Sequence, residues 1–164
     1  MARTAKRRHL TAIDPKAMSD LSTNYDKSWA IVIGINHYEH LNPLDRATRD
    51  AAGMADLLIT KLGFPKENVF LVLDPPPNDL SSNLRVHSQR ASKVVMEDLI
   101  FNRLPELTKA NDRVLAFYAG HGERRPVSEA NLDTVGYLVP SDATPDKWHT
   151  FIGWDAIVLS RPTQ

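Results

Sequence analysis

The stretch DRVLAFYAGHGE, residues 112–123, decides the fold of this chain. Its apolar run at residues 114–119 is almost continuous, which is typical of a strand buried on both faces of a parallel sheet. The run leads directly into Gly120-His121-Gly122, where a glycine on each side of the histidine lets the backbone turn sharply. The stretch therefore predicts a rigid strand that presents a histidine at its carboxyl end.

Two earlier apolar runs share this pattern, and a helical stripe separates them. Residues 29–35 (WAIVIGI) and 69–73 (VFLVL) predict two more buried strands. Residues 47–62 place their apolar side chains at helical spacing, and Gly63 follows where a left-handed residue often ends a helix. The pattern predicts a strand, a helix and a strand in that order.

The remaining segments complete the alternation. Residues 74–90 form a long loop, which indicates a binding rim or a mobile insertion. Residues 92–107 predict a second helix with Ser92 as its cap, residues 135–139 a shorter fourth strand, and residues 148–159 the start of another helix.

This order of elements predicts the fold class. Strands that alternate with helices are typical of an α/β three-layer sandwich, with a mostly parallel sheet and helices on both faces. Ligands of such sheets bind outside the carboxyl ends of the strands. The residues expected at those ends are Asn36, His37, Tyr38, Asp74, Gly120, His121 and Gly122.

His121 and Gly122 are the candidates for chemistry. An imidazole on a rigid strand end suits a general base or the partner of a thiolate, and the Gly122 amide could face a developing oxyanion. The alternative is a loop histidine whose neighbouring glycines serve only the turn. From spacing alone we favour this alternative.

Composition excludes several other classes of protein. The chain has 164 residues, 42% of them apolar, which suits one globular domain. It contains no cysteine, so a thiol nucleophile, a disulfide and a zinc–thiolate site are excluded within it. Its 20 basic and 20 acidic residues balance, which argues against nucleic-acid or anionic-membrane partners.

The first 27 residues are expected to be a disordered basic arm. Arg3, Lys6, Arg7 and Arg8 lie close together there, and no apolar run typical of a signal peptide or a membrane span follows them. We interpret the arm as a solvated terminus, with a nuclear-import or phosphate-binding tail as the alternative. A cytoplasmic location is expected, and the basic arm makes a nuclear location the alternative.

Five segments, in this order and at these distances, resemble the caspase and metacaspase family of cysteine endopeptidases. They are WAIVIGINHY (29–38), LDRATRDAAGMADLLITKLGF (44–64), NVFLVLD (68–74), DRVLAFYAGHGE (112–123) and GYLVPSDA (136–143). The resemblance covers residues 29 to about 143 and extends with weaker support to residue 159. It implies that residues 28–164 are a partial caspase-like catalytic domain, the large-subunit portion. Such a domain would act on peptide or protein substrates once it is completed.

The resemblance also implies roles for particular residues. His121 matches the histidine of the family's cysteine–histidine dyad, and the Gly122 N–H matches one oxyanion donor. Arg46 stands where caspases that cleave after aspartate place a specificity arginine, but metacaspases usually lack it there. We therefore interpret Arg46 as a solvated loop residue, with a substrate-binding role as the alternative. His37 is expected at the rim of the substrate site. No cofactor is expected, and calcium dependence of the metacaspase type stays open.

The absent cysteine is a departure from the family pattern. The family's nucleophile follows the next buried strand, downstream of the VPSDA segment, and this sequence stops at Gln164 before such a strand. We interpret the chain as truncated and inactive by itself. We also expect strand 114–119 to keep an unpaired edge, which predicts poor solubility or a partner at that edge.

Three alternatives remain. The first is a non-catalytic caspase-like module that binds a homologue or another partner through the open edge. The second is a metal-dependent hydrolase, with ligands drawn from His37, His40, Asp74, His121 and His149. The third is a nucleotide-binding domain, which is weak because the first strand is not followed by a glycine-rich phosphate loop.

Overall fold

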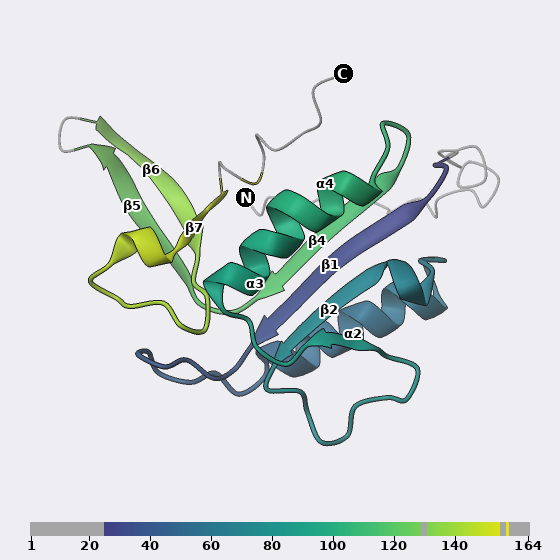
Figure 1. Cartoon of the computed structure of the whole chain (residues 1–164). Helices are drawn as coiled ribbons and strands as arrows, with labels where there is room; N and C mark the ends of the chain where they lie inside the picture. Colours follow the sequence, from purple (N-terminus) through teal and green to yellow (C-terminus); the bar gives the residue numbers. More distant parts are fainter. Residues whose placement is uncertain (1–24, 129–130, 155–156, 158–164) are drawn as a thin grey trace, which may run out of the picture.

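A computed structural model describes residues 25–128, 131–154 and 157 of the chain (Figure 1). The basic arm predicted at the amino terminus lies almost entirely outside the described residues. Four parallel strands form the main sheet in the order β3-β2-β1-β4. Their bounds are β1 Ser28–Ile35, β2 Val69–Asp74, β3 Val86–Ser88 and β4 Arg113–Ala119.

Helices cover both faces of this sheet, as the sequence predicts. Helix α2, Ala47–Thr60, lies against one face. On the other face α3 (Lys93–Glu97), the π-helical segment η2 (Asp98–Arg103) and α4 (Leu104–Leu107) follow one another without a break (Figure 1). The three-layer α/β sandwich with a mostly parallel sheet is confirmed. A short 3₁₀ turn, η1 (Lys66–Asn68), leads into β2.

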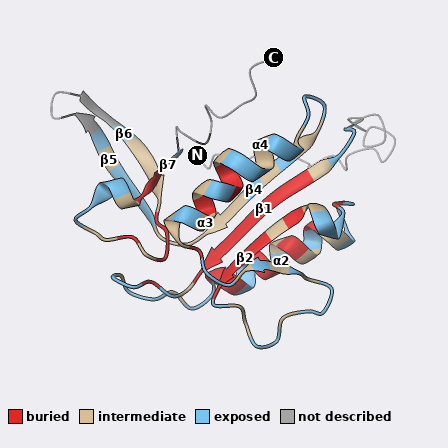
Figure 2. Ribbon diagram, in the orientation of Figure 1, coloured by how far each residue is buried: buried red, intermediate tan, exposed pale blue. Residues whose placement is uncertain are grey.

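The core is built on the alternation of side chains along β1. Ala30 and Val32 are 0% exposed and pack toward α2, whereas Ile31 and Ile33, each 2% exposed, pack toward the helices on the other face. Figure 2 shows the buried residues concentrated in β1 and β2. Full burial of a valine or isoleucine side chain stabilises the fold by about 1.5–3 kcal/mol. The sequence of β1 is continuously apolar because both faces of the strand are covered.

Helix α2 lies unusually close to β1 at Gly34. A Cβ atom placed on Gly34 would lie 2.6 Å from the Ala47 carbonyl oxygen, 2.7 Å from the Ala51 Cβ and 2.8 Å from the Thr48 Cα. Two of these three neighbours are backbone atoms, so they cannot move aside independently of the helix. Glycine at this position is therefore required by the close approach of helix and strand.

Side chains from distant segments satisfy the first N–H groups of two helices. Asn36, just after β1, accepts the Thr48 N–H at 3.2 Å and donates to the Thr48 hydroxyl at 2.9 Å. Asp142 accepts the Lys93 N–H at the start of α3 at 2.8 Å. Ser92 stands at the N-cap position of α3 but makes no capping hydrogen bond through its side chain, so its predicted capping role is wrong. These bonds fix the helix starts to the carboxyl edge of the sheet.

A second, antiparallel sheet follows β4 directly. It contains β5 (Gly122–Ser128), β6 (Asn131–Leu138) and β7 (Ile152–Gly153), in the order β5-β6-β7. The fourth strand predicted at residues 135–139 is β6; it begins earlier and belongs to this sheet instead of the parallel one. The helix predicted from residue 148 begins as the 3₁₀ turn η3 (Trp148–Thr150), which leads into β7. Most of its remaining residues lie outside the described part of the chain.

Strand β4 lies at one edge of the parallel sheet. Within the described residues it pairs only with β1, on one side. On the α3 side its apolar surface is partly open, since Val114 is 47% exposed. No helix among the described residues has the length and apolar character needed to cross a membrane.

Candidate active site

His121 stands at the carboxyl edge of the parallel sheet, two residues after β4 ends. The segments that follow β1 and β2 meet at the same edge, because the Asn36 and His37 N–H groups donate to the Asp74 carbonyl oxygen at 2.8 and 3.2 Å. The sheet thus brings the strand ends together as its parallel topology predicts.

Three contacts orient His121. Its backbone N–H donates to the Tyr38 hydroxyl at 2.7 Å, and its ring lies 4.7 Å from the Tyr38 ring, centroid to centroid. Its Nε2 lies 2.8 Å from the Asn42 carbonyl oxygen. Since a carbonyl can only accept, Nε2 carries a proton in this arrangement, and Nδ1 is the basic atom of the neutral ring.

Tyr118 holds the backbone at the carbonyl group of His121. Its hydroxyl lies 2.8 Å from the His121 carbonyl oxygen and 2.9 Å from that of Val139, and it donates its single proton to either one. Burial raises the pKa of Tyr118, and the neighbouring Tyr38 raises it further. Burial also raises the pKa of Tyr38. Both phenols therefore stay neutral: Tyr118 donates to a backbone carbonyl, and Tyr38 accepts the His121 N–H.

The two tyrosines leave no room for a side chain at Gly120. A Cβ atom there would lie 2.5 Å from the Tyr118 hydroxyl oxygen and 2.6 Å from that of Tyr38. Within the described residues only Gly63 has a positive φ, of 71°. Gly63 thus has the left-handed backbone predicted after α2. At Gly120, by contrast, glycine is needed for close packing and not for a left-handed turn.

A cavity of about 220 Å³ opens beside the imidazole. Its lining residues are Leu41, His121, Gly122, Glu123, Arg125, Val139, Pro145 and Phe151. The structure thus brings His121 and Gly122 together at one cavity. It does not bring His37 or Arg46 there: both are exposed, and Arg46 stands at the start of α2. The oxyanion role of Gly122 and the substrate-binding roles of His37 and Arg46 stay predictions.

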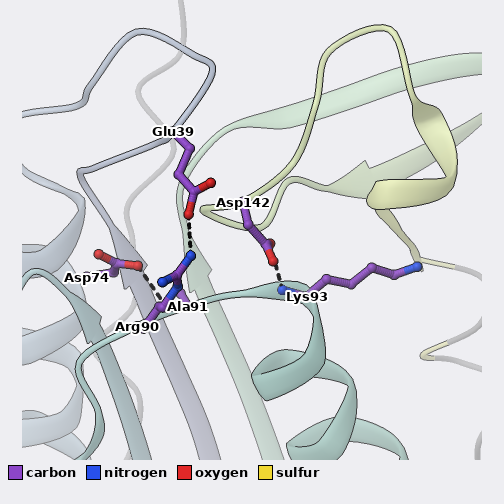
Figure 3. Close-up of polar contacts among 6 residues, drawn as sticks. All are labelled: Glu39, Asp74, Arg90, Ala91, Lys93 and Asp142. Carbon is purple, nitrogen blue, oxygen red and sulfur yellow. Dashed lines mark hydrogen bonds and ion pairs between the residues drawn. The ribbon is translucent and has the colours of Figure 1, made fainter.

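Polar contacts tie the loop after β1, which also holds His121, to other segments of the chain (Figure 3). The buried Asp74 carboxylate accepts the Ala91 N–H at 2.9 Å, and Glu39 forms an ion pair with Arg90. In the backbone, the Glu39 N–H donates to the Ser141 carbonyl, and the Ser141 N–H donates to the Ala91 carbonyl, both at 2.9 Å. The loop after β1, the segment after β6 and the approach to α3 therefore form one connected base for the site.

Replacement of Asp74 by alanine is expected to destabilise this base. Ala91 is 0% exposed, so its N–H would lose its acceptor without access to water. We expect a loss of about 1–3 kcal/mol in the free energy of unfolding, measured by chemical denaturation. Asp74→Asn keeps an acceptor oxygen and should lose less.

Asp79 in the same loop offers a matched control. Its side chain is 72% exposed and lies 3.5 Å from Arg49. Asp79→Ala should change the free energy of unfolding by less than about 1 kcal/mol. An equal loss in Asp74→Ala and Asp79→Ala would contradict a special role of the buried carboxylate.

The residues of the metal-dependent alternative do not converge. Among the described residues no three histidine, aspartate or glutamate side chains are placed to hold a metal ion. His37, His40 and His149 are exposed, and the Asp74 carboxylate is bonded to the Ala91 N–H. The described geometry therefore gives no support to a metal-dependent hydrolase.

Two features of the candidate site could not be located from sequence alone, the carbonyl that holds His121 and the arginine in the cavity wall. The Asn42 carbonyl is a backbone group in a loop, and no side-chain pattern marks it. The Arg125 side chain lies on β5, a strand that the sequence did not predict. Tyr38 was expected near the strand ends, but its bond to the His121 N–H depends on the path of the loop.

A parallel sheet between two helical layers, with an anchored histidine just after the end of its edge strand, defines a caspase-like α/β protein. Comparison with known families agrees: the model of the Caspase domain family matches residues 27–161. The chain therefore belongs to the caspase domain family.

Curated relatives are metacaspases at modest identity. Metacaspase-6 of Arabidopsis thaliana is 28% identical over 116 residues, which are 69% of this chain and 29% of that protein. Metacaspase-1A of Aspergillus oryzae is 28% identical over 104 residues, covering 63% of this chain and 23% of the relative. Metacaspase-1B of Aspergillus clavatus is 26% identical over 143 residues, covering 82% and 31%. The chain thus spans less than a third of the length of each of these relatives.

Proposed function

We propose that this chain provides the histidine half of a cysteine-type endopeptidase site, and that it hydrolyses no peptide by itself. The observation that carries the proposal is the anchored imidazole of His121 at the end of an edge strand. With Nε2 held by the Asn42 carbonyl, Nδ1 is the basic atom that can exchange a proton with a nucleophile. The sequence contains no cysteine to act as that nucleophile.

A cysteine at the carboxyl end of a strand paired with β4 would complete the dyad. His121 would take the thiol proton, and the thiolate would attack the scissile carbonyl to form a tetrahedral oxyanion, with the Gly122 N–H as a donor. The imidazolium would then protonate the leaving amine as the carbon–nitrogen bond breaks. Water would hydrolyse the resulting thioester and release the free thiol.

The open side of β4 supports the position of this strand. β4 pairs with β1 in parallel register on one side, and a further parallel strand would end at the same edge of the sheet as His121. An apolar cavity of about 420 Å³ lies beside β4 on the α3 side, with Ile100, Leu104, Val114 and Ala116 in its lining. An incoming strand and its connection would bury this surface, which favours pairing.

The test extends the whole chain with a flexible linker and an apolar strand that ends in Asp-x-Cys. The chain alone should hydrolyse none of a panel of fluorogenic peptides. The extended chain should hydrolyse some of them, and either His121→Ala or cysteine→serine in the added strand should lower the rate at least about a thousandfold.

Two results would overturn the proposal. One is hydrolysis by the unextended chain that His121→Ala abolishes, because the nucleophile would then lie within this sequence. The other is an extended protein that is folded, with the new strand paired to β4, and still inactive. That second result would favour the non-catalytic interaction module instead.

A further inference from the structure

A second small cavity lies far from His121, toward the amino ends of the parallel strands. It has a volume of about 190 Å³ and lies where η1 leads into β2 and where β3 begins. Its lining residues are Lys66, Glu67, Val69, Phe70, Arg85, His87 and Arg103. Since His121 follows the carboxyl end of β4, the cavity is separate from the candidate active site.

Three separate segments bring positive charge to this cavity. Lys66 belongs to η1, Arg85 directly precedes β3, and Arg103 is the last residue of η2. Glu67 is the one carboxylate among the lining residues. The lining therefore has an excess of positive charge, and a concave surface concentrates the resulting electric field.

Most of this charge is not neutralised within the described part of the chain. Arg85 has no hydrogen bond or ion pair there, and Glu67 lies beyond ion-pair distance of all three cations. The Lys66 Nζ donates only to the Ser82 carbonyl, at 3.4 Å. Arg103 has an acidic partner, Asp98, at 3.8 Å. Two of the three cations thus keep their charge free for a ligand.

His87 lies among these cations and reports their field. The Arg103 Nη1 lies 3.2 Å from the His87 Nε2. Because a guanidinium can only donate, Nε2 accepts and the imidazole is neutral in this arrangement. Desolvation of the ring lowers the pKa of His87, and the charges of Arg103 and Arg85 lower it further, whereas Asp98 opposes them. The ring also meets Phe70 edge to face, with centroids 5.3 Å apart, which fixes its place beside the cavity.

We propose that this cavity binds a phosphate group, either as the free ion or as a phosphate monoester. The phosphate oxygens accept charge-assisted hydrogen bonds from the two guanidinium groups and from the Lys66 ammonium. The cavity is smaller than the roughly 300–1,000 Å³ of pockets that enclose drug-sized ligands, so it suits one small group. A phosphate offers three acceptor oxygens and up to two negative charges, which match cations placed on three segments. The proposal does not depend on the proposed peptidase function.

The test follows binding to the whole chain by NMR. The ¹⁵N-labelled chain is titrated at constant ionic strength with inorganic phosphate, with N-acetyl-O-phosphoserine amide and with N-acetyl-aspartic acid amide. The Arg85 and Arg103 Nε–H signals should shift to saturation with the two phosphate probes. Phosphate should bind at least about tenfold more tightly than the aspartate probe, since a monocarboxylate has one charge and fewer acceptors.

The two phosphate probes distinguish the sources of the group. Tighter binding of the phosphoserine probe would support a phosphorylated side chain as the ligand, and equal or tighter binding of inorganic phosphate would support the free ion. The absence of a saturable shift with either probe, or equal affinity for phosphate and the aspartate probe, would overturn the proposal.

The His87 ring gives a second readout of the same event. Bound phosphate places negative charge beside the imidazole, so the pKa of His87 should rise from its lowered value. Lys66, Arg85 and Arg103 act against this rise, and the carboxylates of Glu67 and Asp98 are present in both states. Ring NMR signals followed through a pH titration, in phosphate and in chloride of equal ionic strength, measure the change. An unchanged His87 pKa in saturating phosphate would place the ion elsewhere and refute the site.

Arg124 provides a matched control for substitution. It is exposed on β5, outside the lining of the cavity, and its Nη2 donates to the Thr134 hydroxyl at 2.9 Å. Arg85→Gln should weaken phosphate binding at least about fivefold, whereas Arg124→Gln, with the same change in net charge, should change it less than about twofold. Equal weakening in both variants would reduce the effect to net charge and refute the site. Thermal unfolding checks that both variants fold, and the comparison of probes on the unmodified chain does not depend on either.

Discussion

Gly34→Ala is expected to lower the free energy of unfolding by about 3 kcal/mol, because the new methyl group has no space between β1 and α2. All three of the atoms nearest to its Cβ would lie within 2.8 Å, a separation at which strand and helix must move apart. Since α2 packs against this face of the sheet, the shift loosens the packing of Val32 and Leu58 as well. Thermal or chemical denaturation measures the loss, and a fall in Tm of roughly 6–12 °C corresponds to it.

Gly53 in the middle of α2 is the matched control. A Cβ atom there meets no atom within 4 Å. Gly53→Ala should therefore stabilise the chain by about 0.5–1 kcal/mol, because alanine has less backbone freedom to lose in a helix. If Gly34→Ala proved as harmless as Gly53→Ala, the close approach of α2 to β1 would be wrong.

Gly120→Ala is expected to displace His121 as well as to destabilise the fold. The new Cβ would press on the hydroxyls of Tyr38 and Tyr118, which bond the His121 N–H and carbonyl. We expect a loss of about 3 kcal/mol, from overpacking together with weakened buried hydrogen bonds. NMR signals of the His121 ring nitrogens should change, because the bond between Nε2 and Asn42 depends on the same backbone position.

A double-mutant cycle tests the cause of this loss. When Tyr38 and Tyr118 are both replaced by phenylalanine, the two oxygen atoms that Gly120→Ala would contact are gone, although the Tyr118 ring carbon at 2.7 Å remains. The cost of Gly120→Ala should then fall by about 1 kcal/mol or more. Strict additivity would contradict the proposed contact. Gly136→Ala, whose Cβ meets nothing within 4 Å, should stay within about 0.5 kcal/mol of the parent.

The parallel sheet could be predicted from sequence because its strands are buried on both faces. Continuous apolar runs around Val32, Leu71 and Leu115 leave few other interpretations, and the structure confirms a strand at each. The helix at residues 47–62 was equally clear, because its apolar side chains repeat at helical spacing against the sheet.

The strands that sequence analysis missed have little apolar surface to reveal them. β3 is three residues long and carries the exposed His87, so no alternation is visible. β5 contains Glu123, Arg124 and Pro126, all exposed, and such a composition is typical of a loop. Their pairing depends on neighbours that are distant in sequence, and local patterns do not contain that information.

Part of the candidate site was predictable because the buried parallel strands could be recognised in the sequence. The parallel topology places strand ends together, so His121 and Gly122 were found at the correct edge of the sheet. The partners that orient His121 were less accessible to prediction. The Asn42 carbonyl and the Tyr38 hydroxyl reach it only because the loop after β1 folds back over the end of β4.

The strand order has a consequence for the sequence of events in folding. β1 occupies the interior of the sheet, and Ala30 pairs with Val69 on one side and with Leu115, about twice as far along the chain, on the other. Contacts between residues close in sequence form faster, and domains begin to fold while the ribosome is still synthesising them. β1, α2 and β2 are therefore expected to assemble first, with β4 docking last. His121 would reach its place only in that final step, so that formation of the core precedes formation of the site.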